Sequence, residues 1–142
     1  VWVTGEIELE NGAEIKLDSS YGSNSGLLIA DGKVEVSNGS LFFGSGQSGS
    51  YVMVLTTSDC PISVYCDGDY AIDVSNNAGA VILNAQKGTI HMNNNAGAKE
   101  ATAYKVVLDN GASVTYESGL ANVSFISGPV GGWNIKKWKE VE

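Results

Sequence analysis

The sequence predicts an all-β domain folded as a right-handed parallel β-helix, a β-solenoid in which each coil lies on the one before it. Three observations support this prediction. Apolar and polar residues alternate in many short runs, Asn-Gly pairs recur between those runs, and no stretch keeps the 3.6-residue period of an amphipathic helix. We therefore expect the regular structure to be strand, with no helix longer than one turn.

The alternating runs predict which side chains form the core. Residues 5–17, 32–43 and 106–116 share one pattern, in which alternating residues are followed by Asn-Gly and then by further alternating residues. Successive side chains of a strand point to opposite sides, so the apolar members of each run face inward. The residues expected to face inward are Ile7, Leu9, Val34, Val36, Ile72, Val74, Ile82 and Ile90.

The Asn-Gly pairs have two interpretations. They suit type I′ hairpin turns, and they also suit solenoid corners in which Asn or Gly takes the left-handed conformation. Asn-marked corners at positions 11, 38, 77, 95 and 110 are separated by 27, 39, 18 and 15 residues. If the 39-residue gap holds two coils, the solenoid has about six to seven irregular coils. The outward positions are mostly Ser, Asn, Asp and Gly, which suit stacked ladders. A β-sandwich is the alternative fold.

The chain is expected to form a single domain over residues 1–142, because this length suits one domain. Residues 127–132 break the strand rhythm, and two of the three tryptophans follow. We expect residues 127–142 to form a C-terminal cap in which Trp133 and Trp138 cover the last coil. A partner-docking surface is the alternative. Strand-like sequence begins at Val1, so we expect a fragment of a longer protein, with its export signal or anchor upstream.

Charge and composition narrow the choice of partners. The chain has 8 basic and 16 acidic residues, a net charge of −8 and no arginine. Nucleic acids and anionic lipids attract basic surfaces, so we expect no nucleic-acid partner and no membrane contact by this domain itself. No apolar run approaches the ~18 residues of a spanning helix.

The two cysteines, Cys60 and Cys66, do not form a C-x-x-C motif. Two thiols and one histidine are too few for a closed metal site, so we expect no metal and no cofactor. The pair is a candidate disulfide of an oxidising compartment. A flat strand would hold the two Cα atoms ~20 Å apart, so a disulfide requires a chain reversal between them. Two reduced cysteines are the alternative.

The end of the chain resembles a known group of proteins. Residues 119–125, the stretch 127–133 and the closing Trp138-Lys-Glu are similar to the end of uncharacterised bacterial surface proteins, which are pilin-like or anchored. Asn94-Asn95-Ala96, followed by Lys99-Glu100 and Tyr104, fits the same pattern, and so do residues 116–120. The resemblance covers roughly residues 5–142. It implies a C-terminal parallel β-helix domain and an extracellular or cell-surface location, and its motifs are structural rather than catalytic.

The candidate ligand-binding residues are Tyr65, Asp67, Asp69 and Tyr70. Paired carboxylates serve glycoside hydrolysis, but we expect Asp67-Gly-Asp69 to form a tight turn, with weak calcium binding as the alternative. Parallel β-helix enzymes that cleave acidic polysaccharides usually use several Asp residues on adjacent coils with a His, or calcium with an Arg. Because the only histidine, His91, alternates with Ile90 and Met92, we expect it to point outward into solvent. No catalytic residue is expected.

These observations favour a non-catalytic cell-surface module with a structural or adhesive role. A carbohydrate-binding domain is the alternative, and a polysaccharide lyase or hydrolase comes third. The partner would be an extracellular glycan or another surface protein. Carbohydrate binding uses exposed aromatic rings as stacking platforms, so several tyrosines on one outer face would form a groove. The tyrosines considered are Tyr51, Tyr65, Tyr70, Tyr104 and Tyr116.

Overall fold

The regular structure is almost entirely strand. The computed structural model describes residues 1–60, 70–79, 82–117, 120 and 123. Within them, the one helical element with bounds of its own is a single 3₁₀ turn, η1 (Ser19–Tyr21). The strands are β1 (Trp2–Val3), β2 (Ile7–Leu9), β3 (Glu14–Lys16), β4 (Gly26–Ala30), β5 (Val34–Val36), β6 (Leu41–Phe43), β7 (Val52–Thr56), β8 (Ile72–Val74), β9 (Ile82–Met92), β10 (Gly97–Ala98), β11 (Glu100–Leu108) and β12 (Ser113–Val114).

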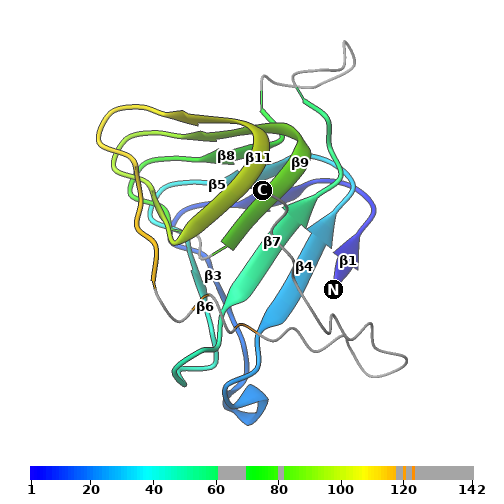
Figure 1. Cartoon of the computed structure of the whole chain (residues 1–142), viewed down its shortest axis with the longest axis vertical. Helices are drawn as coiled ribbons and strands as arrows, with labels where there is room; N and C mark the ends of the chain where they lie inside the picture. The colour runs from blue at the N-terminus through cyan, green and yellow to red at the C-terminus, as the bar shows by residue number, and fades with distance from the viewer. Residues whose placement is uncertain (61–69, 80–81, 118–119, 121–122, 124–142) are drawn as a thin grey trace, which may run out of the picture.

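The strands pair in parallel and build a solenoid with three faces (Figure 1). The first face contains β1, β4, β7 and the beginning of β9, and the second contains β2, β5, β8 and the end of β9. β11 pairs with β9 along both faces. The third face contains β3, β6, β10 and β12, with Gly79 bridging Leu41 and Gly97. These pairings confirm the parallel β-helix and exclude the β-sandwich.

The core consists of apolar side chains stacked in rows from coil to coil. The register Ile7↔Val34↔Ile72↔Ile90 forms one such row, and Leu9↔Val36↔Val74↔Met92 forms the next. All eight residues predicted to face inward are buried. Full burial of a Val, Leu or Ile side chain stabilises a fold by ~1.5–3 kcal/mol, so the rows together account for much of the hydrophobic stabilisation.

The corners between the second and third faces are pairs of left-handed residues. Asn11 and Gly12 have φ of 58° and 75°, and the same conformation recurs at 38–39, 76–77, 94–95 and 110–111. Asn and Gly tolerate this conformation better than other residues. The flanking strands belong to different faces, so these are solenoid corners and not hairpin turns. Asn76, Asn94 and Asn110 each donate a side-chain hydrogen bond to the Asn of the preceding coil, at 3.2, 3.0 and 3.3 Å.

The described residues form five coils rather than the expected six or seven. The 39-residue gap between Asn-marked corners was expected to hold two coils, but Val34 pairs directly with Ile72. The gap is therefore one coil with an insertion between β7 and β8. The corner positions also differ by one residue, because Asn76 and Asn94 align with Asn38, whereas Asn77 and Asn95 occupy the position that Gly39 fills.

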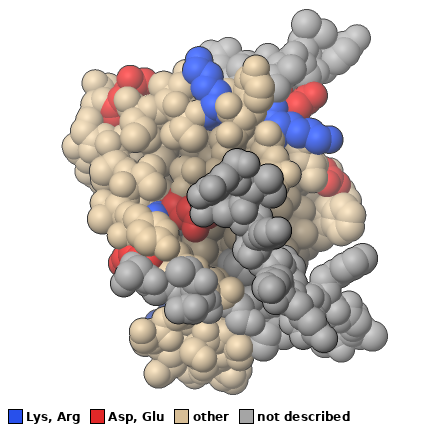
Figure 2. Space-filling view, viewed as in Figure 1, with Lys and Arg blue, Asp and Glu red and all other residues tan. Residues whose placement is uncertain are grey.

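The described ends of the insertion lie against a bend in β9. The Thr89 N–H donates to the Cys60 carbonyl at 2.7 Å. A Cβ atom on Gly88 would lie 2.4 Å from Cβ of Ala71 and 2.7 Å from the Ser58 carbonyl oxygen, so this position accommodates only glycine. Charged side chains are few and scattered over the face in Figure 2. Among the described residues, no helix has the length and apolar character needed to cross a bilayer.

Candidate functional site

Most of the predicted site residues lie outside the part of the chain that the structure describes. These residues are Tyr65, Cys66, Asp67, Asp69, Trp133 and Trp138. Tyr70 is described, and its ring stacks on His91 with centroids 4.2 Å apart and an interplanar angle of 20°. Cys60 is buried and disulfide-bonded. Its pairing with Cys66 stays a prediction.

His91 was expected to point into solvent, and that prediction is wrong. The ring does lie on the outer side of the second face, but the residue is only 8% exposed. Nδ1 lies 3.0 Å from Oδ1 of Asp73 on the preceding coil, and Nε2 lies 3.2 Å from Oδ2 of Asp109. The Asn93 amide nitrogen also lies 3.3 Å from Nδ1. The two aspartates and the Tyr70 ring therefore cover the His91 side chain, which the alternation of apolar and polar residues predicted to be exposed to solvent.

The structure thus brings Asp73, His91 and Asp109 together, as an aspartate–histidine cluster that spans three coils. Both ring nitrogens face carboxylate oxygens, which accept hydrogen bonds when ionised. A general acid or base must reach the substrate directly or through one water, and here the carboxylates occupy both nitrogens. Within the described ranges, no group of three His, Cys, Asp or Glu residues is arranged to hold a metal ion.

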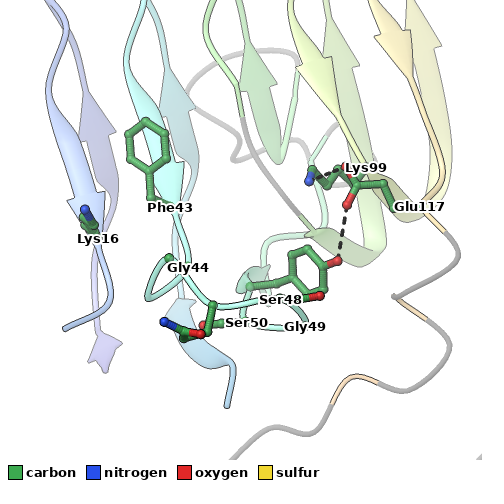
Figure 3. A pocket seen from close by; sticks show the side chains of 11 residues that line it. Lys16, Phe43, Gly44, Ser48, Gly49, Ser50, Lys99 and Glu117 are labelled. Atoms are coloured by element: carbon green, nitrogen blue, oxygen red, sulfur yellow. Dashed lines mark hydrogen bonds and ion pairs between the residues drawn. The ribbon is translucent and has the colours of Figure 1, made fainter. Parts of the chain in front are cut away.

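A second feature is an open groove where the third face meets the loop that precedes β7 (Figure 3). Its volume is about 410 Å³. The groove combines aromatic, cationic and small polar side chains with exposed backbone. The lining residues are Lys16, Phe43, Gly44, Gly46, Gln47, Ser48, Gly49, Ser50, Tyr51, Lys99 and Glu117.

One end of the groove is a linked group of three side chains. Nζ of Lys99 lies 2.5 Å from Oε1 of Glu117 and 5.3 Å from the centre of the Tyr51 ring. The Tyr51 hydroxyl donates to Oε2 of Glu117 at 3.2 Å, as the dashed lines in Figure 3 show. The hydrogen bond from Lys99 lowers the pKa of Glu117 below its ordinary value; partial desolvation opposes this, while the Lys99 charge and the Tyr51 hydroxyl add to it.

The wall of the groove is the glycine- and serine-rich loop 44–50. Ser50 Oγ accepts from the Ser45 N–H at 2.9 Å and donates to the Asn24 carbonyl at 2.7 Å. Gly46 and Gly49 have φ of 92° and 84°, a region where other residues are strained. A buried serine hydroxyl and two left-handed glycines therefore hold the loop against the preceding coil.

Lys16, Phe43 and Lys99 occupy equivalent positions on different coils. Lys16 and Phe43 are direct register partners of β3 and β6. The bridges from Leu41 to Gly79 and from Gly79 to Gly97 carry the same register onward, and Lys99 stands two residues after Gly97 as Phe43 does after Leu41. We call this set the Lys16–Phe43–Lys99 row. Phe43 is 37% exposed, so part of its ring is open to a ligand.

Four of the five tyrosines considered from the sequence are described, and of these four only Tyr51 lines the groove. Tyr70 covers His91, while Tyr104 and Tyr116 are exposed at 71% and 61% outside the groove lining. The sequence reasoning missed Lys16, Phe43 and Lys99. Each stands five residues after a corner asparagine, namely Asn11, Asn38 and Asn94, and that spacing was the signal that could have identified them.

No family model, curated protein or solved structure matches this chain. The resemblance to bacterial surface proteins therefore stays a prediction.

Proposed function

We propose that this chain is a non-catalytic adhesive module of a secreted or surface-displayed protein, and that it holds an extracellular glycan in the groove. The observation that carries the proposal is the partly exposed Phe43 ring beside Lys16, in a groove that Tyr51 also lines. Aromatic faces pack on the C–H surface of a sugar ring, and neighbouring polar groups bind its hydroxyls. Ser48 and Gln47, which carry a hydroxyl and an amide, line the same groove.

The absence of catalysis is part of the proposal. Each ring nitrogen of His91 lies within hydrogen-bond distance of an aspartate, so neither is presented to a substrate. Among the described residues that line the groove, Glu117 is the one carboxylate, and it is bound to Lys99 and Tyr51. Glycoside hydrolysis ordinarily needs two carboxyl groups on opposite sides of the bond. These arrangements favour binding without turnover.

Two observations favour a location outside the cytoplasm. Cys60 is disulfide-bonded, and disulfides persist mainly in oxidising compartments. The end of the chain resembles bacterial surface proteins that are pilin-like or anchored. In this proposal an anchor upstream of Val1 holds the solenoid at the surface, and the domain itself contacts neither membrane nor nucleic acid.

A purely structural role is the second candidate. The observation that favours it is the run of side-chain hydrogen bonds from Asn38 through Asn76 and Asn94 to Asn110, which links successive coils at their corners. Together with the stacked apolar rows, this ladder makes a stiff rod that could act as a spacer. The groove would then have no ligand.

A glycan array probed with the purified domain separates the two candidates. We expect binding to a subset of glycans, lost in Phe43→Ala, because that variant removes the stacking ring. Tyr104→Ala is the matched control, since it removes an aromatic ring that is 71% exposed outside the groove lining. Absence of binding by the intact domain would leave the structural role. Release of shortened glycans during incubation, abolished in His91→Asn, would overturn the non-catalytic assignment.

A further inference from the structure

We propose that the groove selects an acidic glycan, whose carboxylates bind Lys16 while a sugar ring packs on Phe43. This inference rests on the proposed glycan-binding function and specifies its ligand class. It is carried by the charge of the groove, by the spacing of the Lys16–Phe43–Lys99 row and by the composition of the loop that forms the wall.

The groove has a local excess of positive charge on an acidic protein. Its described lining residues include two lysines and one glutamate, whereas the whole chain has a net charge of −8. Lys99 is neutralised by Glu117. No hydrogen bond or ion pair of the Lys16 ammonium occurs in the part of the chain that the structure describes, so that charge is available to a ligand. By contrast, Lys33 is bound to Glu35 at 2.8 Å.

The row places charge and aromatic surface along one line across the coils. Neighbouring parallel strands lie ~4.8 Å apart, so Lys16 and Phe43 are one step apart and Lys99 lies two steps further. The whole row spans ~14 Å. A polymer lying along it would meet the free cation first, then the Phe43 ring, and finally the Lys99–Glu117 pair. An anionic polysaccharide offers the repeated carboxylates and apolar ring faces that this order requires.

The loop wall contains no group that repels an anion. Its sequence, residues 44–50, is Gly-Ser-Gly-Gln-Ser-Gly-Ser, with no Asp or Glu. Glycines let a ligand approach the backbone closely, and exposed N–H groups, amides and hydroxyls donate hydrogen bonds to carboxylate oxygens. The wall thus supplies donors beside the Lys16 charge, and this combination favours a carboxylated sugar over a neutral one.

The test compares two forms of one glycan. Calorimetric titration uses a galacturonic acid oligosaccharide and its methyl ester, which share a backbone but differ in charge. We expect the acid to bind about fivefold more tightly, the equivalent of ~1 kcal/mol for one partly exposed ion pair. Lys16→Gln should abolish this preference, because it removes the charge and keeps a polar side chain at the same position. The preference should also weaken as salt rises, because exposed charges are screened.

Lys87→Gln is the matched control, since Lys87 is an exposed lysine in the β9 bend, outside the groove lining. It should leave both affinities unchanged. Equal binding of acid and ester, or a preference for the acid that survives in Lys16→Gln, would overturn the acidic-glycan inference and leave the proposed function standing. If the intact domain binds neither oligosaccharide nor any glycan on the array, the glycan-binding function itself fails.

Discussion

Asp73 and His91 are register partners on neighbouring coils, and the Asp73 carboxylate lies 3.0 Å from Nδ1 of the His91 ring. Asp109 reaches the opposite nitrogen from the following coil. The histidine thus joins three coils on the outside of the solenoid, where the inward-facing apolar rows make no contacts between coils. We therefore expect His91 to stabilise the packing of these coils.

His91→Ala is expected to destabilise the domain by ~1–3 kcal/mol, because it leaves two neighbouring carboxylates without their partner. Glycan affinity should be unaffected, since the cluster is separate from the groove lining. Urea unfolding followed by circular dichroism measures the first effect, and calorimetric titration measures the second. An unchanged unfolding midpoint would show that the cluster does not stabilise the coils. Tyr104→Ala, at an exposed site, is the control and should change stability by less than ~0.5 kcal/mol.

Gly88→Ala should be destabilising by ~1–3 kcal/mol, because its methyl group would overlap Ala71 and the Ser58 carbonyl. The bend in β9 would have to move away from the insertion. Gly97→Ala is the matched control on the same coil, where an added Cβ meets no atom within 4 Å. Thermal unfolding of both variants checks the prediction. Equal melting temperatures would mean that the insertion moves aside without loss.

Two substitutions at Asn94 separate backbone conformation from the asparagine ladder. Asn94→Ala loses two side-chain hydrogen bonds and places alanine at φ 50°, which costs about 1–2 kcal/mol for the conformation alone. Asn94→Gly loses the same bonds but tolerates the left-handed conformation. We expect the glycine variant to retain clearly more stability in urea unfolding. If the two variants were equally unstable, the ladder and not the corner conformation would set the preference for Asn.

The repeating fold was predictable because each coil repeats the same physical requirements. Inward Val and Ile residues and left-handed Asn or Gly corners are local features, and the sequence displays both. The number of coils was not predictable from corner spacing alone. An insertion adds residues to a coil without adding a corner. The spacing of 38 residues between Val34 and Ile72 is therefore long enough for two coils, although it belongs to one.

The Lys16–Phe43–Lys99 row depended on an alignment that was wrong by one residue. Lys16 and Phe43 stand five residues after Asn11 and Asn38, but Lys99 stands only four after Asn95, the corner expected from the sequence. With Asn94 as the corner, Lys99 also stands five residues after it. Asp73 and His91 are equally spaced from the corner with either choice, so the row and this pair both follow from the sequence once the corners are aligned. Their contacts with Asp109 and Glu117 do not, because these come from less regular segments.

The pKa of the Glu117 carboxyl should lie below 4.5, its ordinary value, because the hydrogen bond from Lys99 favours the ionised form. Because the pKa is lowered in the folded state, the ion pair contributes to folding stability above pH 4.5. That contribution is lost as the pH falls through the folded-state pKa. Carbon-detected NMR of the Glu117 carboxyl measures the midpoint. Lys99→Met should move it upward. A midpoint at the ordinary value in the intact domain would contradict the Lys99–Glu117–Tyr51 arrangement.

The last described coil leaves apolar side chains exposed, and this observation bears on the predicted C-terminal cap. Val106 and Leu108 are 40% and 46% exposed, whereas their register partners Ile90 and Met92 are fully buried. Val106 and Leu108 therefore continue the two inward rows, and their exposure marks the open end of the described solenoid. The cap prediction, which assigns Trp133 and Trp138 to this end of the solenoid, concerns residues outside the described part of the chain.

If residues 127–142 cover this end, Trp133→Ala and Trp138→Ala should each destabilise the domain by ~3–5 kcal/mol, as expected for a buried tryptophan. That is a large share of a typical total stability of ~5–15 kcal/mol, so deletion of residues 128–142 should produce aggregation through the exposed edge of β11. Urea unfolding and size-exclusion chromatography measure these effects. A deletion variant that stays monomeric with an unchanged unfolding midpoint would contradict the cap. The two tryptophans would then be available for docking a partner, because they would bury nothing in the domain itself.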